Sequence, residues 1–167
     1  DELDYTYFRL GNAYWELGQY DKSMEYHQQS IAVSRQKGQL TPLGIARRMS
    51  IALLKQGKPR EALKMLNEIV DKRIQCSVED KMYLAQGMGS CYNELQQYDL
   101  AEKYYLESVA FSKQTPQHFQ RLANRGIAQF YVNNAQYANA EPYLQFLLNA
   151  SLQQMLPNYL IDVHRMW

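Results

Sequence analysis

The stretch LGNAYWELGQYDKSMEY, residues 10–26, spaces small, large and aromatic residues at intervals that recur every 39 positions along the chain. The small residue at its start corresponds under this shift to Gly11, Ser50, Gly89 and Ala128. The aromatic or large residue three positions later corresponds to Tyr14, Leu53, Tyr92 and Tyr131. The small residue nearer its end corresponds to Ser23, Ala62, Ala101 and Ala140. Self-similarity at a fixed period of a few tens of residues indicates a repeat protein, here of four units.

Each unit has the pattern of two amphipathic helices. In the first unit, one helical stripe consists of Tyr7, Leu10, Tyr14 and Leu17. Gly18 is expected to end this helix, and Asp21 to cap a second one whose buried face includes His27. Small residues on both helices, such as Gly11 and Ser23, would allow the pair to approach closely, so the intervals predict a helical hairpin with a tightly packed seam.

The pattern predicts an all-α fold, an α-solenoid in which antiparallel helix pairs form a right-handed superhelix. The expected helices cover 4–17, 21–37, 42–56, 59–75, 78–95, 99–114, 116–134, 139–155 and 157–167. The repeats would cover about 4–40, 41–77, 78–115 and 116–156, with 157–167 the start of a truncated fifth repeat. The chain would then be part of a longer array.

Residue types at the expected helix starts support this division. Thr41-Pro42 and Thr115-Pro116 each offer an N-cap followed by proline at the first helical position. Ser77 and Asp80 have the spacing of a capping box. Pro157 is expected to open a last helix, and Pro142 to lie in a first turn, where proline is tolerated.

The repeated pattern resembles the tetratricopeptide repeat (TPR) family, whose signature is a large residue, Leu-Gly and Tyr, followed by Ala and an aromatic in the second helix. The segments YFRLGNAYWELGQYDKSMEYHQQS and AQGMGSCYNELQQYDLAEKYYLES carry this signature most fully. The usual repeat has 34 residues, and the longer period here is similar to TPR segments of bacterial signalling proteins. The Tyr- and Gln-rich units and the closing LIDVHRMW are most like those of sensor histidine kinases. The resemblance implies a protein- or peptide-binding module, the sensory or scaffolding part of a two-component signal-transduction protein.

Composition and motifs argue against other classes of function. A net charge of +1 gives no support to nucleic-acid or membrane contact by this segment. There is no phosphate loop, HExxH motif or nucleophile elbow, so we expect no enzyme activity, cofactor or metal site in this chain. His27 is expected in the core and His118 and His164 in solvent, while Cys76 and Cys91 are expected to be free thiols.

The face of each first helix opposite the hairpin seam is the candidate binding surface, because first helices line the concave side of a TPR array. The candidate residues on these helices are Tyr5, Phe8, Arg9, Asn12, Trp15, Arg47, Arg48, Leu54, Tyr83, Asn93, Arg125 and Gln129. Their arginines and aromatic rings favour a protein or peptide partner with acidic residues. The rings of Tyr5 and Phe8 could instead pack on another segment.

Some TPR proteins clamp a peptide's terminal carboxylate with a fixed set of Lys, Asn and Arg residues. Only Asn12 matches that set, and Phe8, Arg48, Tyr83 and Gly87 depart from it, so this clamp is not expected. Two alternatives to a signalling module stay open: the regulatory array of a DNA-binding transcription regulator, and a structural or oligomerisation scaffold. Self-association through the truncated end fits the scaffold. The compartment is open as well, cytoplasmic or, beside a membrane sensor kinase, periplasmic.

Overall fold

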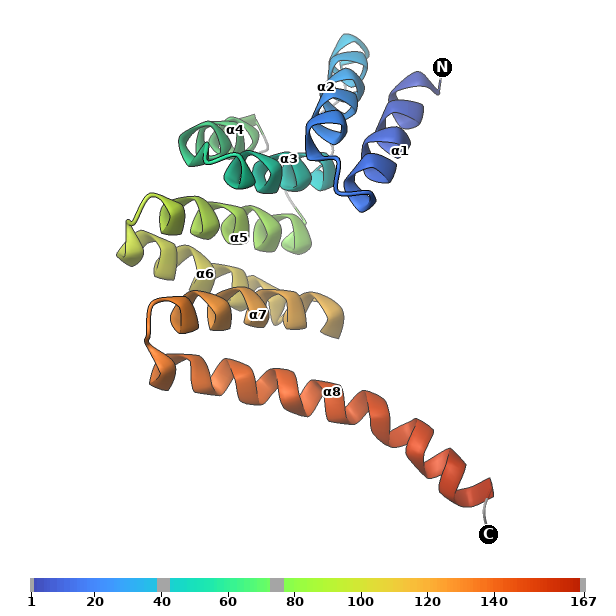
Figure 1. Ribbon diagram of the computed structural model, residues 1–167, viewed down its shortest axis with the longest axis vertical. Helices are drawn as coiled ribbons and strands as arrows, with labels where there is room; N and C mark the ends of the chain where they lie inside the picture. The colour runs from blue at the N-terminus through green and yellow to red at the C-terminus, as the bar shows by residue number, and fades with distance from the viewer. Residues whose placement is uncertain (1, 39–42, 73–76, 166–167) are drawn as a thin grey trace.

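The chain is built from α-helices stacked in sequence order (Figure 1). The computed structural model describes residues 2–38, 43–72 and 77–165, and within these ranges every regular element is a helix. The helices are α1 (Leu3–Glu16), α2 (Tyr20–Gln36), α3 (Leu43–Lys55), α4 (Pro59–Lys72), α5 (Val78–Glu94), α6 (Tyr98–Ser112), α7 (Gln117–Asn133) and α8 (Tyr137–Arg165). The all-α prediction is confirmed.

Neighbouring helices pair as hairpins, and the hairpins stack on one another. The pairs are α1–α2, α3–α4, α5–α6 and α7–α8, and each second helix also contacts the first helix of the next pair. Among the first helices, α5 contacts both α3 and α7, so the three form one surface of the solenoid. A solenoid of antiparallel helix pairs was the architecture that the 39-residue period predicts.

Small residues bring the two helices of each hairpin together, as expected. The Ser23 hydroxyl donates a hydrogen bond to the carbonyl of Gly11 at 2.8 Å, and both residues are buried. A Cβ on Gly11 would lie only 2.5 Å from the His27 ring. In the third hairpin, a Cβ on Gly89 would lie 3.1 Å from the ring of Tyr105, which stands in the register of His27.

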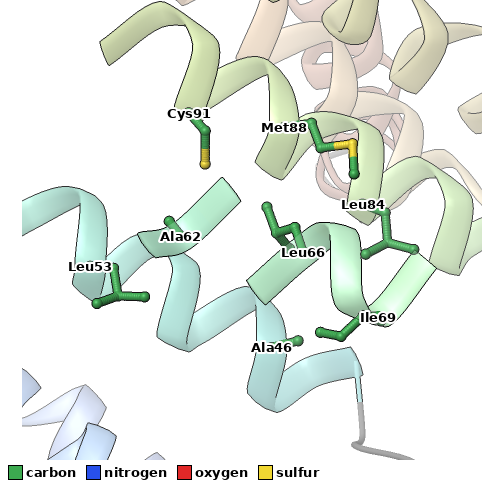
Figure 2. Close-up of a cluster of buried hydrophobic side chains, with 8 residues drawn as sticks. All are labelled: Ala46, Leu53, Ala62, Leu66, Ile69, Leu84, Met88 and Cys91. Atoms are coloured by element: carbon green, nitrogen blue, oxygen red, sulfur yellow. The ribbon is translucent and has the colours of Figure 1, made fainter. Parts of the chain in front are cut away.

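The apolar core consists of clusters of buried side chains, each of which joins one hairpin to the next. Figure 2 shows the cluster that joins the second and third hairpins, where Leu66 of α4 points between α3 and α5. Its buried members are Ala46, Leu53, Ala62, Leu66, Ile69, Leu84, Met88 and Cys91. A second cluster joins the third and fourth hairpins and contains Ala101, Tyr105, Ile127, Phe130, Tyr131 and Ala140. Each hairpin therefore buries apolar surface between its own two helices and also against the neighbouring hairpin, as solenoids do.

The hairpin turns share one backbone feature at a fixed register. Gly18 and Gly57 have φ of +72° and +71°, and the equivalent residues Gln96 and Ala135 have φ of 59° and 57°. Gly18 thus follows the end of α1, as expected. Asp21 does not cap α2, because the helix already begins at Tyr20 and the Asp21 carboxylate accepts a hydrogen bond from Gln56 at 2.7 Å.

The predictions at the other helix starts have mixed outcomes. The capping box of Ser77 and Asp80 is confirmed, with the Ser77 hydroxyl accepting from the Asp80 amide at 3.1 Å. Thr115 is not an N-cap: its hydroxyl donates to the Ser112 carbonyl at 2.7 Å, and Pro116 itself precedes the first residue of α7. The pair Thr41-Pro42 lies outside the described residues.

The last helix differs most from the prediction. We expected helices over 139–155 and 157–167, but α8 is continuous from Tyr137 to Arg165. The two predicted helices are separated by residue 156 alone, and one residue is too short a segment to reverse the direction of the chain. The helix therefore continues through this position, and Pro157 lies inside it. Pro142 lies in the second turn and not the first. The division into repeats, including a fifth one from 157, stays a prediction.

We call the interface between two consecutive hairpins a joint. The first joint, between the first and second hairpins, differs from the later ones. Gly87 of α5 and Gly126 of α7 permit close packing on the preceding hairpin, since a Cβ there would lie 3.0 Å from Leu66 and 2.7 Å from Gln86. The equivalent residue of α3 is Arg48, whose long side chain cannot occupy such a space. In Figure 1 the α1–α2 hairpin is turned steeply relative to the nearly parallel helices α5, α6 and α7.

Candidate functional site

A cavity of about 200 Å³ opens on the surface made by α3, α5 and α7. Its lining consists of Arg47, Ser50, Ile51, Leu54, Tyr83, Gln86, Gly87, Ser90, Leu122 and Arg125. The structure thus brings together four of the residues that the sequence predicts for a binding surface, namely Arg47, Leu54, Tyr83 and Arg125. They come from three repeats and meet because α5 contacts both α3 and α7.

Two of the residues that line this cavity carry positive charge, Arg47 of α3 and Arg125 of α7. The Arg47 guanidinium lies over the Tyr83 ring, with its Cζ 5.0 Å from the ring centroid. Burial lowers the pKa of Arg47, and the charges of Arg48 and Arg125 lower it further, while Tyr83 acts in the opposite direction. Among the described residues, no carboxylate forms an ion pair with Arg47 or Arg125. The cavity therefore has cationic groups that are available to an anion.

A second cavity, of about 270 Å³, continues this surface toward α6. Its lining consists of Gln86, Ser90, Tyr105, Arg125, Gly126, Gln129, Phe130 and Asn133. Ser90 and Tyr105 share a hydrogen bond of 2.9 Å between their hydroxyls, and the Gln86 amide donates to the Leu122 carbonyl at 3.3 Å. We call the two cavities together the groove. It combines apolar walls, polar hydrogen-bonding groups and arginine.

Several groove residues were absent from the predicted set. Ser50, Gly87, Gly126 and Phe130 line the groove, although sequence reasoning did not select them. The two glycines share one register, which in retrospect marks where α5 and α7 approach the preceding hairpin. Phe130 carries no comparable signal, because its position relative to the neighbouring helices depends on how the hairpins stack.

The predicted residues of α1 lie apart from the groove. Phe8 packs against His27, with 6.2 Å between ring centroids, and Trp15 lies edge-on to Tyr20 at 4.9 Å. Tyr5 is 58% exposed, and Arg9 lies beside it with its Cζ 5.9 Å from the Tyr5 ring centroid. Neither cavity is lined by a residue of α1, because the first hairpin is turned away at the joint.

The remaining predicted residues are Arg48, Asn93, Gln129 and Asn12, and only Gln129 lines the groove. Arg48 lies over the Trp15 ring at 5.6 Å and pairs with Glu16 at 3.4 Å, so it belongs to the first joint. Asn93 accepts a hydrogen bond from Asn134 at 3.4 Å. Gln129 lines the second cavity and donates to Asn133 at 2.7 Å. Asn12 has a buried side-chain oxygen without a hydrogen-bond partner.

Reactive side chains are scattered in the described part of the chain. No three of the described His, Cys, Asp and Glu residues lie close enough together to hold a metal ion. His27 is fully buried and His118 is exposed, as expected, whereas the side chain of His164 lies outside the described residues. Cys91 is a free, buried thiol, and burial raises its pKa to about 12. Cys76 is not among the described residues, and within them no helix could span a membrane.

Solved structures with the same arrangement confirm the fold class. The crystal structure of MamA superposes with a TM-score of 0.61 at 14% identity, covering 91% of this chain and 80% of that one. The MamA fragment 41-end from Desulfovibrio magneticus RS-1 gives 0.62 at 13% identity, covering 90% and 77%. A putative kinesin light chain from Podosopora anserina, described as nearly identical TPR-like repeats, gives 0.64 at 17% identity, covering 89% and 74%.

Sequence comparison leads to the same repeat family. The comparison with curated protein sequences found no match. Two family models, both described as tetratricopeptide repeat, match residues 2–75 and 84–115, which together make up more than half of the chain. The matched segments contain the first two hairpins and most of the third, from residue 84 of α5 to the end of α6. The chain belongs to the tetratricopeptide repeat family.

Proposed function

We propose that this chain is a protein-binding module whose groove holds an extended, acidic segment of a partner protein. The observation that supports this most strongly is the convergence of Arg47 and Arg125 on one cavity without a carboxylate partner among the described residues. Like charges that are held together raise the electrostatic free energy of the unbound groove. Aspartate or glutamate side chains would relieve that repulsion.

Apolar contacts supply the second part of the proposed recognition. Leu54, Ile51 and Leu122 line the same cavity as the two arginines, and Tyr83 presents its ring beneath Arg47. A segment that alternates acidic and apolar side chains would satisfy both kinds of surface. The charges would mainly set the association rate and specificity, while buried apolar side chains would slow dissociation.

The experiment measures binding of a labelled peptide that alternates glutamate and leucine, by fluorescence anisotropy at low and high salt. We expect Arg47→Glu together with Arg125→Glu to weaken binding at least tenfold, and salt to weaken binding to the unchanged protein. The matched control is Arg60→Glu on α4, an exposed arginine that lines neither cavity. Equal loss in the control variant, or binding that is insensitive to salt, would contradict the proposal.

We further propose that the module is the sensory or scaffolding part of a larger bacterial signalling protein of the sensor histidine kinase type. The support is the lengthened 39-residue repeat and the resemblance of its Tyr- and Gln-rich units to such segments. The sequence of the parent gene tests it: a membrane-spanning segment and kinase motifs would support the sensor. A helix-turn-helix domain would instead identify the array as part of a transcription regulator.

A further inference from the structure

A histidine stands at a tightly packed position of the first hairpin. The His27 ring on α2 is fully buried against α1, where it packs on Gly11 and lies 6.2 Å from Phe8 between ring centroids. At the same register the later repeats have Leu66, Tyr105 and Leu144. Leucine does not ionise and tyrosine gains no proton in acid, so only the first of the four repeats has a side chain here that binds a proton.

The His27 ring makes no hydrogen bond with any described residue. Both ring nitrogens are buried without a partner, and so is the side-chain oxygen of Asn12 on α1. In the third repeat the equivalent residues, Ser90 and Tyr105, join their hydroxyls at 2.9 Å. A neutral imidazole has one N–H group, whereas an imidazolium has two and a full charge, which makes its burial without partners far more unfavourable. Burial accordingly lowers the pKa of His27 to about 4.

The charge that acts on the ring comes from the second hairpin. Arg48 of α3 lowers the pKa of His27 further, because two positive charges repel each other. Arg48 also contacts α1: its Cζ lies 5.6 Å from the Trp15 ring centroid, and its Nη1 lies 3.4 Å from Glu16 Oε1. The neighbours of the ring on α1, Phe8 and Gly11, carry no charge. A proton on His27 would therefore repel the arginine that joins α1 to α3.

Other contacts hold α1 on α2 at neutral pH. The Ser30 hydroxyl donates to the Asp4 carbonyl at 2.8 Å, and the Asp4 carboxylate pairs with Lys37 at 2.8 Å. The hydrogen bond from Lys37 lowers the pKa of Asp4 from its ordinary value of 3.8. This ion pair thus keeps its charge over the pH range in which His27 binds a proton. Acid reaches α1 through His27 before it breaks this pair.

We infer that protonation of His27 releases α1 from the solenoid, so that the first hairpin opens in acid while the later hairpins stay folded. The charged ring reaches water only when α1 and α2 separate, and it repels Arg48 from its contacts on α1. The ordinary pKa of the exposed ring is 6.5, so the open state binds more protons than the closed state between about pH 4 and 6.5. Acid therefore favours opening, by up to about tenfold in the equilibrium constant for each pH unit.

The fluorescence of Trp15 reports the position of α1, because its ring lies beneath Arg48 at the first joint. The chain has two tryptophans, and Trp167→Phe leaves Trp15 as the only one. We expect its emission to move to longer wavelength as the pH falls from 7 to 4.5. Helix content, measured by circular dichroism, should fall by no more than α1 and α2 contribute. In the same background, His27→Leu should abolish the change in emission.

The matched control is His118→Leu, which removes an exposed histidine of α7 and should leave the change in emission intact. Should His27→Leu not fold, His27→Tyr copies the third repeat and serves the same purpose. An emission change that persists in the His27 variant and disappears in Glu16→Gln would assign it to the Arg48–Glu16 ion pair and overturn the inference. Loss of all helix content together with the emission change would do so as well.

The pH-sensitive hairpin and the proposed function can be tested apart. Neither His27 nor Trp15 lines the groove. Peptide binding at pH 7 by the His27 variant should therefore equal that of the unchanged protein. Failure of the glutamate–leucine peptide to bind either protein would contradict the proposed function and leave the emission change as a separate result.

Discussion

His27 is the least satisfied polar side chain among the described residues. Both ring nitrogens are buried without hydrogen-bond partners, as is the side-chain oxygen of Asn12. The equivalent residues of the third repeat, Tyr105 and Ser90, join their hydroxyls in a 2.9 Å hydrogen bond. Burial lowers the pKa of His27 to about 4, and the nearby charge of Arg48 adds to the effect, so the ring is neutral at pH 7.

Replacing this histidine should change how stability depends on pH. The folded-state pKa lies below the ordinary value of 6.5, so the unfolded chain binds more protons between about pH 4 and 6.5. Stability attributable to His27 is therefore complete above pH 6.5 and is lost as the pH falls toward 4, by roughly 3 kcal/mol. We expect His27→Leu, which copies Leu66 of the second repeat, to remove this part of the acid sensitivity. Chemical denaturation at pH 7 and pH 4.5 measures it, and an unchanged difference between the two would refute a buried neutral ring.

Ala101 gives a test of the hairpin seam. Ala101 of α6 is completely buried in the cluster that contains Tyr105, and the Tyr105 ring already packs closely on Gly89 of α5. We expect Ala101→Leu to lower the free energy of unfolding by roughly 1–3 kcal/mol through overpacking. Ala110→Leu, an exposed site on the same helix, serves as the control and should have little effect. Equal thermal stability of the two variants would show that the repeats are misaligned.

At the scale of the helices, periodicity predicted most of what the structure shows. The first seven helices lie within a few residues of their expected bounds, because apolar spacing and turn residues both repeat four times. The predictions that are wrong depend on a single local signal. Asp21 and Thr115 have good capping side chains, but their carboxylate and hydroxyl bond elsewhere. Proline is common at helix starts, but Pro157 lies inside α8, because the one residue between the two predicted helices is too few to form a turn.

Replacing alanine by glycine should change the free energy of unfolding in opposite directions in a hairpin turn and in a helix. Ala135 has a left-handed φ of 57°, where the first two repeats have glycine. Such a conformation is unfavourable for a residue with a Cβ, by roughly 1–2 kcal/mol, and glycine's greater freedom in the unfolded chain offsets part of that. We expect Ala135→Gly to stabilise the protein by about 0.5–1 kcal/mol. In the last turn of α6, where the backbone is helical, Ala110→Gly should instead destabilise the protein, by up to about 1 kcal/mol. Urea denaturation measures both changes in the free energy of unfolding. Destabilisation at both sites would contradict the left-handed conformation of Ala135.

At the scale of the whole molecule, the candidate site was only partly predictable. The 39-residue shift placed Arg47, Tyr83 and Arg125 on one side of successive first helices, and the structure gathers all three. The same reasoning placed Phe8 and Trp15 in that row, yet both pack within the first hairpin and its joint. A period in the sequence fixes which face a residue occupies, but it does not fix the angle between consecutive hairpins. The hairpin with the different angle is also the one that meets Arg48, at a register where later repeats have glycine.

This unequal stacking predicts that the solenoid does not open uniformly. Stability in a repeat array is approximately the sum of each unit and its interfaces with its neighbours. The second and third hairpins share a large buried cluster, whereas the first joint depends on half-exposed groups such as Arg48 on Trp15 and Lys55 on Tyr20. We therefore expect amide hydrogens of α1 and α2 to exchange faster than those of α5 and α6, through local opening of the first hairpin. Hydrogen exchange followed by mass spectrometry measures this, with α6 as the internal reference. Equal protection in α2 and α6 would mean that the first hairpin unfolds only with the rest of the array.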